Sequence, residues 1–307
     1  MKQLLILSGK GGTGKTTIAS GLIKLANVQS YADCDVDAPN LHLAMSQDSI
    51  PSVNDFYGLN VAWIDRKKCI LCGNCLNNCR FNAINAIDSY IVDPYSCEGC
   101  SVCQLVCSAE AINMKERIVG ITELYSNTHV FSTAQLNMGS GNSGLLVTQV
   151  KKGLLPYKDK FNLSIIDGSP GIASISGVQM VLIVAEPSIS GYHDMIRIIK
   201  TSEGFPAIIG VCINKYNLNT DITNEIIDFC KGKDIPFLGT LPYDEMVLET
   251  INKGLTIADM DSPIKNELEK DPNNSFQWYN LGATYMGQGK YNEAIDAFIQ
   301  SHHLAKV

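Results

Sequence analysis

The sequence predicts an α/β protein whose mainly parallel sheet is interrupted by a cysteine-rich insertion. A short apolar run at residues 4–7 enters a glycine-rich loop and then a helix-like pattern, which is typical of a buried strand followed by a helix. Further apolar runs at 163–166, 181–185 and 208–213 are separated by stretches long enough for helices, and this favours parallel strands. Between residues 59 and 118 the alternation stops, and eight of the eleven cysteines fall there.

The composition limits the class of protein. The chain has 307 residues, 45% of them hydrophobic, which is enough for two domains with buried cores. With a net charge of −7 and no long basic run, we expect no nucleic-acid surface. No apolar stretch is long enough to span a membrane, and the N-terminal apolar run is too short for a signal peptide. We therefore expect a cytoplasmic protein, in which disulfides are disfavoured.

The loop at residues 9–17 reads GKGGTGKTT. Strand, glycine loop and helix is the context that a phosphate-binding loop requires, because the glycines let backbone N–H groups turn toward a polyphosphate at the helix N-terminus. Lys15 supplies a positive charge to the phosphates, and Thr16 offers a hydroxyl to Mg²⁺. The residues predicted to contact the nucleotide here are Gly11, Gly12, Thr13, Gly14, Lys15, Thr16 and Thr17.

Lys10 is not needed by an ordinary phosphate-binding loop. With it, residues 10–16 resemble the deviant Walker A loop of the MinD/ParA/Mrp group of P-loop ATPases. In that family the early lysine reaches across a dimer to the partner's nucleotide. The resemblance therefore implies an ATPase that forms a nucleotide-sandwich homodimer, with Lys10 and Lys15 in catalytic roles.

Acidic residues follow two predicted strands. By resemblance to the family's first switch, Asp35 would orient the attacking water and Asp33 would hold Mg²⁺ through a water. Asp167 ends the apolar run at 163–166, which is the position of a Walker B acid that holds Mg²⁺ together with Thr16. The segment 167–171, DGSPG, resembles the family's second switch.

The base of the nucleotide is predicted to meet the carboxyl ends of later strands. In the family, the asparagine in the position of Asn214 reads the adenine edge, and the loop that contains Pro242 lies against the base. Short strands at 118–121 and 128–131 are expected to return the chain to the sheet after the insertion.

The insertion carries one cysteine pattern twice, C-x2-C-x2-C-x3-C from Cys69 and again from Cys97. This is the spacing of a two-cluster bacterial ferredoxin, in which the fourth cysteine of each run ligates the other cluster. One [4Fe–4S] cluster is thus assigned to Cys69, Cys72, Cys75 and Cys107, and the other to Cys79, Cys97, Cys100 and Cys103. Arg80 and Ser108 stand where the motif has proline. Two zinc sites are the alternative, although zinc sites usually pair C-x2-C hooks across a longer gap.

The sequence pattern changes near the end of the chain. Trp278, Leu281, Gly282, Tyr285, Ala294 and Phe298 fall at the spacing of a tetratricopeptide repeat. A single repeat cannot bury its own face, so it must dock on the ATPase, on a second copy or on another protein. The predicted parts are an α/β P-loop ATPase domain (1–58 and 119–262), an inserted α+β ferredoxin domain (59–118) and a C-terminal helical hairpin (263–307).

Two functions fit these parts. In the first, ATP binding, dimerisation and hydrolysis gate electron transfer through the two clusters to a protein partner. In the second, the chain is an assembly factor for iron–sulfur or other metal cofactors, or a MinD-like positioning ATPase, and its clusters are structural or sensory. Cys212 and Cys230 are too far apart in sequence to form the C-x2-C pair of iron–sulfur scaffold ATPases, which weakens the assembly reading.

Overall fold

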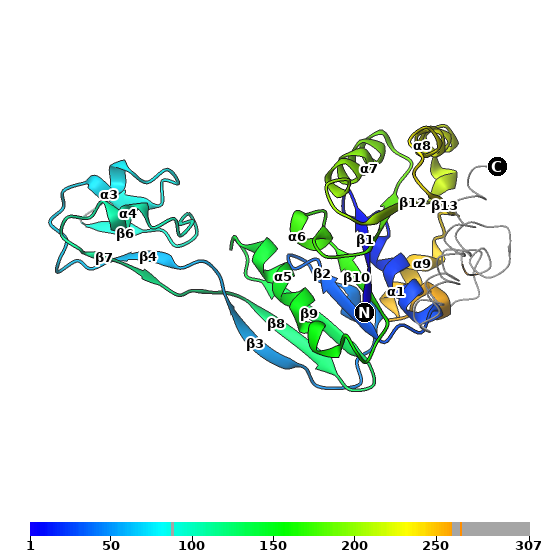
Figure 1. Ribbon diagram of the computed structural model, residues 1–307, viewed down its shortest axis with the longest axis horizontal. Helices are drawn as coiled ribbons and strands as arrows, with labels where there is room; N and C mark the ends of the chain where they lie inside the picture. Colours follow the sequence, from blue (N-terminus) through cyan, green and yellow to red (C-terminus); the bar gives the residue numbers. More distant parts are fainter. Residues whose placement is uncertain (87–88, 260–264, 266–307) are drawn as a thin grey trace.

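A computed structural model describes residues 1–86, 89–259 and 265. The predicted C-terminal hairpin, 263–307, lies outside the described residues apart from Lys265. The described chain forms a large α/β body and a small outlying lobe, residues 61–115, which two strands carry away from the body (Figure 1). No helix in the described ranges is long and apolar enough to cross a membrane.

The body is built on a nine-stranded sheet in the order β13-β12-β11-β1-β10-β2-β9-β8-β3. The strands from β13 to β9 run parallel, and β8 and β3 add an antiparallel edge. The predicted mainly parallel sheet is thus confirmed. Its strands are β1 Lys2–Ser8, β2 Ser30–Cys34, β3 Ser52–Tyr57, β8 Ile118–Ser126, β9 Val130–Leu136, β10 Leu163–Gly168, β11 Met180–Ala185, β12 Ile208–Asn214 and β13 Phe237–Leu241.

Helices cover both faces of this sheet. Side chains alternate along a strand, so Leu5 and Leu7 of β1 pack with α5, α7 and α8, whereas Leu4 and Ile6 pack with α1. Burial on both faces explains why the parallel strands read as continuous apolar runs. The helices of the body are α1 Lys15–Leu25, α2 Leu41–Ala44, α5 Ser143–Gly153, α6 Ile172–Ile175, α7 Ile189–Ser202, α8 Thr220–Gly232 and α9 Met246–Asn252, with single 3₁₀ turns at Leu155–Tyr157, Tyr216–Leu218 and Ile257–Asp259.

The outlying lobe has its own small core. Antiparallel pairs join β4 to β7 and β5 to β6, and two short helices lie beside them. Its elements are β4 Val61–Ile64, α3 Asn74–Asn77, β5 Ile84–Ala86, β6 Tyr90–Val92, α4 Val102–Leu105 and β7 Ile112–Lys115. Six side chains form the buried centre, two of them cysteines: Ala62, Ile64, Cys75, Ile84, Cys103 and Ile112.

The two halves of the lobe repeat one backbone conformation. Left-handed residues occur at equivalent steps of the two cysteine runs, namely Leu71, Gly73 and Asn82 in the first and Gly99, Ser101 and Glu110 in the second. Positive φ is costly for a residue with a side chain, so its recurrence at matched steps reflects a shared turn geometry. The cysteine spacing is therefore matched by a repeated fold of the chain around it.

Candidate functional site

The loop between β1 and α1 forms the wall of a cleft of about 540 Å³, a size typical of small-molecule sites. The cleft lies at the carboxyl end of β1, where open α/β sheets bind ligands. Gly12 and Gly14 adopt φ values of 83° and 89°, which suit glycine. A β-carbon on Gly14 would lie 2.3 Å from Nδ2 of Asn214, so this loop packs too tightly for a larger residue.

Three predicted residues meet at the floor of the cleft. The Lys15 ammonium pairs with the carboxylate of Asp167, which is fully buried at the end of β10. The Thr16 hydroxyl lies 2.6 Å from Asp167 Oδ2 and 2.8 Å from Asn40 Oδ1. A buried carboxylate needs such partners because desolvating a lone charge is costly. The predicted lysine, hydroxyl and Walker B acid are thus brought into direct contact.

The two aspartates at the carboxyl end of β2, Asp33 within the strand and Asp35 just after it, differ in environment. Asp33 is fully buried and accepts backbone N–H bonds from Asp35, Asn40 and Leu41 at 2.8–3.0 Å. Burial raises the pKa of Asp33 to about 6, and the nearby charge of Asp167 adds to the rise, although the backbone donors oppose it. Asp33 therefore fastens the segment 35–41, which we call the first switch segment.

Asp35 stands at the open side of the same floor. Its Oδ2 lies 3.8 Å from the Lys15 Nζ, and its side chain is one-third exposed. Partial burial raises the pKa of Asp35, and the Lys15 charge opposes that rise. Asp35 is the carboxylate with access to the cleft, whereas both oxygens of Asp33 accept hydrogen bonds from the backbone.

Asn214 holds the glycine loop in addition to lining the cleft. Its Nδ2 donates to the Thr13 carbonyl at 2.7 Å, and its Oδ1 accepts from the Lys215 N–H at 3.0 Å. The Lys215 ammonium donates to the Gly12 carbonyl at 2.7 Å. Both polar ends of the Asn214 amide are therefore engaged within the chain. Pro242 lines the same cleft, and the adenine contacts assigned to these two residues stay predictions.

Lys10 lies at the rim of the cleft. Its ammonium donates to Ser190 Oγ at 3.0 Å, at the start of α7. Gly9 packs against Asp194 of the same helix so closely that a β-carbon there would lie 2.1 Å from the Asp194 Cβ. The loop is thus supported by α7, and the bond that holds Lys10 is an exposed one that a competing anion can replace.

Sequence reasoning missed Lys151. This residue lies on α5, and its half-buried ammonium donates to the carbonyls of Ser174 and Ala173 at 2.8 and 3.4 Å and also to that of Ser176. Burial lowers the pKa of Lys151. The carbonyls belong to α6 and its end, directly after the predicted second switch, and unpaired carbonyls at a helix C-terminus attract a cation. No local sequence signal marks Lys151, because its partners come from another part of the chain.

The eight cysteines of the lobe gather around two pockets. The first cysteine pocket is lined by Cys69, Cys72, Cys75 and Cys107. The second cysteine pocket is lined by Cys79, Cys97, Cys100 and Cys103. Three members of each set come from one run and the fourth from the other run, which is the grouping that the ferredoxin spacing predicts.

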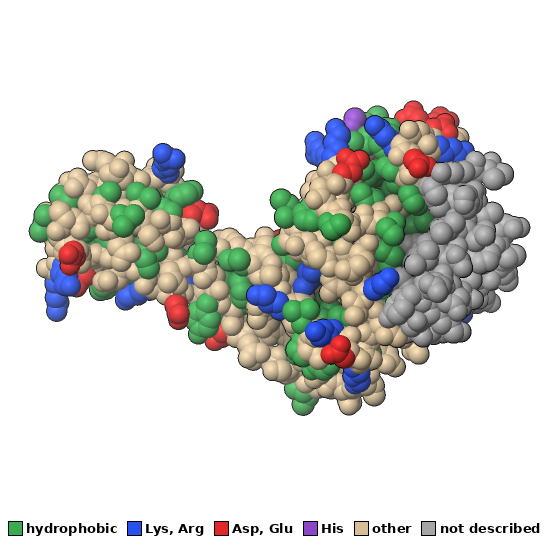
Figure 2. Space-filling view, in the orientation of Figure 1, with side chains coloured by type: hydrophobic (Ala, Val, Ile, Leu, Met, Phe, Trp, Pro, Cys, Tyr) green, Lys and Arg blue, Asp and Glu red, His purple; other side chains and the backbone are tan. Residues whose placement is uncertain are grey.

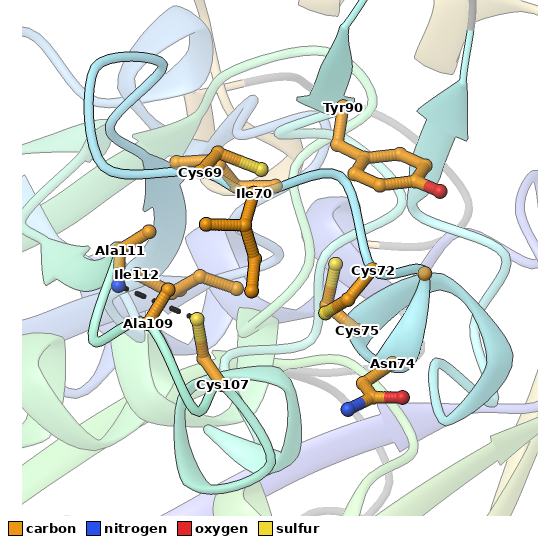
Figure 3. A pocket seen from close by; sticks show the side chains of 12 residues that line it. Cys69, Ile70, Cys72, Asn74, Cys75, Tyr90, Cys107, Ala109, Ala111 and Ile112 are labelled. Atoms are coloured by element: carbon orange, nitrogen blue, oxygen red, sulfur yellow. Dashed lines mark hydrogen bonds between the residues drawn. The ribbon is translucent and has the colours of Figure 1, made fainter.

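The first cysteine pocket is shown in Figure 3, where the four sulfur atoms face one hollow. The Ala111 N–H donates to the Cys107 sulfur at 3.3 Å. Burial raises the pKa of the Cys75 thiol, and nearby Cys69 and Cys107 raise it further. Burial and neighbouring cysteines raise the pKa of Cys103 in the second pocket in the same way. Four thiolates in one pocket thus require positive charge between them.

A single ion does not suit these pockets. Among the described residues, no group of three His, Cys, Asp or Glu side chains is close enough to hold one metal ion. A tetrahedral zinc site would bring sulfurs to within about 4 Å of one another, since each Zn–S bond is about 2.3 Å. In a [4Fe–4S] cluster each thiolate binds a different iron, so its sulfurs stand farther apart. Four cysteines line each pocket, which is the number of protein ligands that a [4Fe–4S] cluster takes.

The remaining three cysteines lie in the body. Cys34, Cys212 and Cys230 are fully buried and distant in sequence from both cysteine runs. Burial raises the pKa of Cys212 and Cys230 to about 12, and it raises that of Cys34 as well. These thiols are packed as small apolar side chains.

Comparison with known proteins agrees with the body's architecture. Residues 4–257 match the family model described as the CobQ/CobB/MinD/ParA nucleotide binding domain. The uncharacterized protein MJ0578 of Methanocaldococcus jannaschii is 30% identical over 284 residues, which cover 87% of this chain and 94% of that protein. A second uncharacterized protein of that organism, MJ0579, is 26% identical over 268 residues, which cover 83% and 91%. Among solved structures, a Cyanothece McdA variant in complex with ATP superimposes with a TM-score of 0.52 at 18% identity and 96% coverage of each chain, a likeness of fold.

We expect Lys151→Met to slow nucleotide hydrolysis about ten- to hundredfold with little change in ADP affinity, because the segment after Asp167 would lose its anchor while the phosphate loop stays intact. Steady-state turnover and calorimetric ADP titration measure the two effects. Lys152→Met is the matched control, since Lys152 is exposed on the same helix. Equal turnover in the Lys151 variant and the wild type would contradict the proposed anchoring role of Lys151.

Proposed function

The chain belongs to the CobQ/CobB/MinD/ParA nucleotide-binding family, and from this premise we propose that it is an ATP-hydrolysing switch whose lobe carries two [4Fe–4S] clusters and exchanges electrons with a protein partner. The observation that carries the proposal is the presence of two four-cysteine pockets and a nucleotide cleft in one chain. In such a chain, a conformational change that depends on the nucleotide could act on a redox group.

The floor of the cleft supports the nucleotide half of the proposal. Lys15 is paired with Asp167 across the place that a phosphate would take, so an incoming triphosphate competes for the ammonium and releases a carboxylate oxygen. Thr16 and Asp167 would then hold Mg²⁺. Asp35, which reaches the cleft, would orient the attacking water, and Lys10 would serve the nucleotide of a partner copy. Asp33 would act on Mg²⁺ only through the segment that it fastens or through a water.

The two cysteine pockets support the redox half. Bound there, [4Fe–4S] clusters would supply one-electron chemistry. The first cysteine pocket offers its four thiols and the Ala111 N–H donor to one cluster, and the second cysteine pocket offers its four thiols to the other. The exposed ligands Cys72 and Cys100 bring each pocket to the surface.

The sheet provides a mechanical link between the two halves. The lobe is attached through β3 and β8, and β8 pairs with β9, the neighbour of β2. The Leu136 N–H at the end of β9 donates to the Val36 carbonyl of the first switch segment at 2.8 Å. Movement of that segment on nucleotide binding therefore acts on the strand that adjoins the lobe's support.

A second candidate is a positioning or cofactor-assembly ATPase whose clusters only hold the lobe together. The small buried centre of the lobe, in which two of six side chains are cysteines, favours this possibility, because so small a unit gains little stability from its apolar core. A positioning role is also consistent with the family. A partner that binds the C-terminal residues would fit either candidate.

Lys15→Ala should abolish ATP binding, since the cation at the cleft floor would be lost. Lys10→Ala should leave binding largely intact but stop ATP-induced dimerisation and hydrolysis, because Lys10 contacts its own chain only through an exposed bond. Calorimetry, light scattering and phosphate release measure the three effects, with exposed Lys158→Ala as the control. Wild-type turnover in the Lys10 variant would contradict the shared-site dimer.

Anaerobically purified protein should contain about eight irons and eight sulfides per chain, the content of two [4Fe–4S] clusters. The Cys69→Ala/Cys107→Ala double variant should lose at most half of the iron, because both residues line one pocket, whereas Cys69→Ala/Cys79→Ala should lose nearly all of it. Cys230→Ala is the control for a buried thiol in the body. Equal losses in the two double variants would refute the crossed ligand assignment.

The switch itself is tested by the midpoint potentials of the clusters in the presence of ATP, of ADP and of no nucleotide. We expect ATP and ADP to give potentials or electron-transfer rates that differ, since the first switch segment adjoins the strands that support the lobe. Identical values in all three states, with full iron content and normal hydrolysis, would favour the second candidate.

A further inference from the structure

The same turn precedes the first cysteine of each half of the lobe. Asp65 accepts the Lys67 N–H on Oδ1 at 2.9 Å and the Cys69 N–H on its carbonyl at 3.0 Å. Asp93 accepts the Tyr95 N–H and the Cys97 N–H in the same way, at 3.0 and 3.1 Å. The two turns share these two hydrogen bonds from backbone N–H groups, and they differ in the side chains that they display.

The first turn carries three consecutive cations, Arg66, Lys67 and Lys68, which we call the basic turn. All three are exposed, and none forms an ion pair with a residue that the structure describes. The basic turn is set between Ile64 and Cys69, which both line the first cysteine pocket. In a chain of net charge −7, this places local positive charge beside one pocket.

The second turn differs in both charge and surroundings. It displays Tyr95, whose ring lies beneath the Arg117 guanidinium at 4.3 Å and beside Gly139 of the body. The second cysteine pocket is lined by the carboxylate-bearing Glu98, at the step where the first half has Ile70. Acidic and basic side chains are both visible on the lobe in Figure 2, which agrees with a surface of mixed sign. The two pockets thus present different electrostatic surroundings.

Apolar side chains complete the surface at the first cysteine pocket. Ile70 and Leu71 are 66% and 57% exposed, and the pocket ligand Cys72 beside them is also exposed. Exposed apolar residues beside a cluster of like charges suit a transient protein interface, in which charge steers the encounter and apolar contact holds it.

We propose that the basic turn, with Ile70 and Leu71, docks an acidic one-electron carrier protein at the mouth of the first cysteine pocket. The inference rests on the proposed function only in that this pocket holds a [4Fe–4S] cluster. One electron passes between that cluster and the carrier, so that one is oxidised and the other reduced by a single electron, and no proton or group is transferred. The second turn, which lies beside Gly139 of the body and carries no such run of cations, is the less favourable place for the same carrier.

The test uses full-length anaerobic protein and two carriers of opposite charge, an acidic flavodoxin and a basic cytochrome c. Wild-type protein should bind flavodoxin more tightly than cytochrome c, with an affinity that falls as salt rises. The Arg66→Glu/Lys67→Glu/Lys68→Glu variant should bind flavodoxin at least about tenfold more weakly, because three steering charges are reversed. Calorimetry or thermophoresis reads binding directly, and stopped-flow absorbance reads electron transfer.

Lys231→Glu/Lys233→Glu is the matched control, since these exposed lysines end α8 in the body, and it should bind flavodoxin as the wild type does. Iron content and ATP turnover of each variant show whether the lobe and the cleft are intact. Three results would overturn the proposal. The first is unchanged flavodoxin binding in the triple variant, and the second is an equal loss of binding in the control. The third is binding of anionic vesicles or duplex DNA that depends on the same three residues. Calorimetry and thermophoresis measure the binding of the carrier without any electron transfer. The test is therefore decisive even if ATP has no effect on the clusters.

Discussion

The contact on which the site depends is the pairing of Lys15 with the fully buried carboxylate of Asp167 beneath the glycine loop. A carboxylate at that depth is tolerable only while a cation or metal and hydrogen-bond donors surround it. The sheet places Asp167 there because β10 lies directly beside β1 with their carboxyl ends at one edge. The fold therefore keeps the negative charge of Asp167 at the floor of the cleft. A ligand that draws the Lys15 ammonium away must bring another positive charge to this carboxylate.

The insertion is compatible with this body because it leaves from the edge of the sheet. The parallel strands that shape the cleft stay contiguous, while β8 and β3 form an antiparallel ribbon at the far side. Within the lobe, two runs of one conformation bring together cysteines from both halves, so neither pocket is complete without the other run. The fold of the lobe and the completeness of its two cysteine pockets are therefore one property.

Features encoded by neighbouring residues could be predicted from the sequence. The glycine loop meets Asp167 at the cleft, and in the lobe the four cysteines of each predicted set line one pocket. The engagement of Asn214 with the Thr13 carbonyl and of Lys151 with α6 could not be predicted, since each joins segments far apart in the chain. Strands β8 and β9 are longer than their apolar runs indicate, because pairing with each other extends them through partly exposed residues.

The attachment of the lobe has a geometric consequence. Among the described residues, β3 and β8 carry the lobe away from the body (Figure 1), and the Gly58 N–H donates to the Arg117 carbonyl just beyond the ends of these strands. Tyr95 of the lobe also lies beside Gly139 of the body. Because the lobe lies at the far end of the ribbon, a rotation of β8 at the sheet would displace the cysteine pockets farther than the strands beside the body.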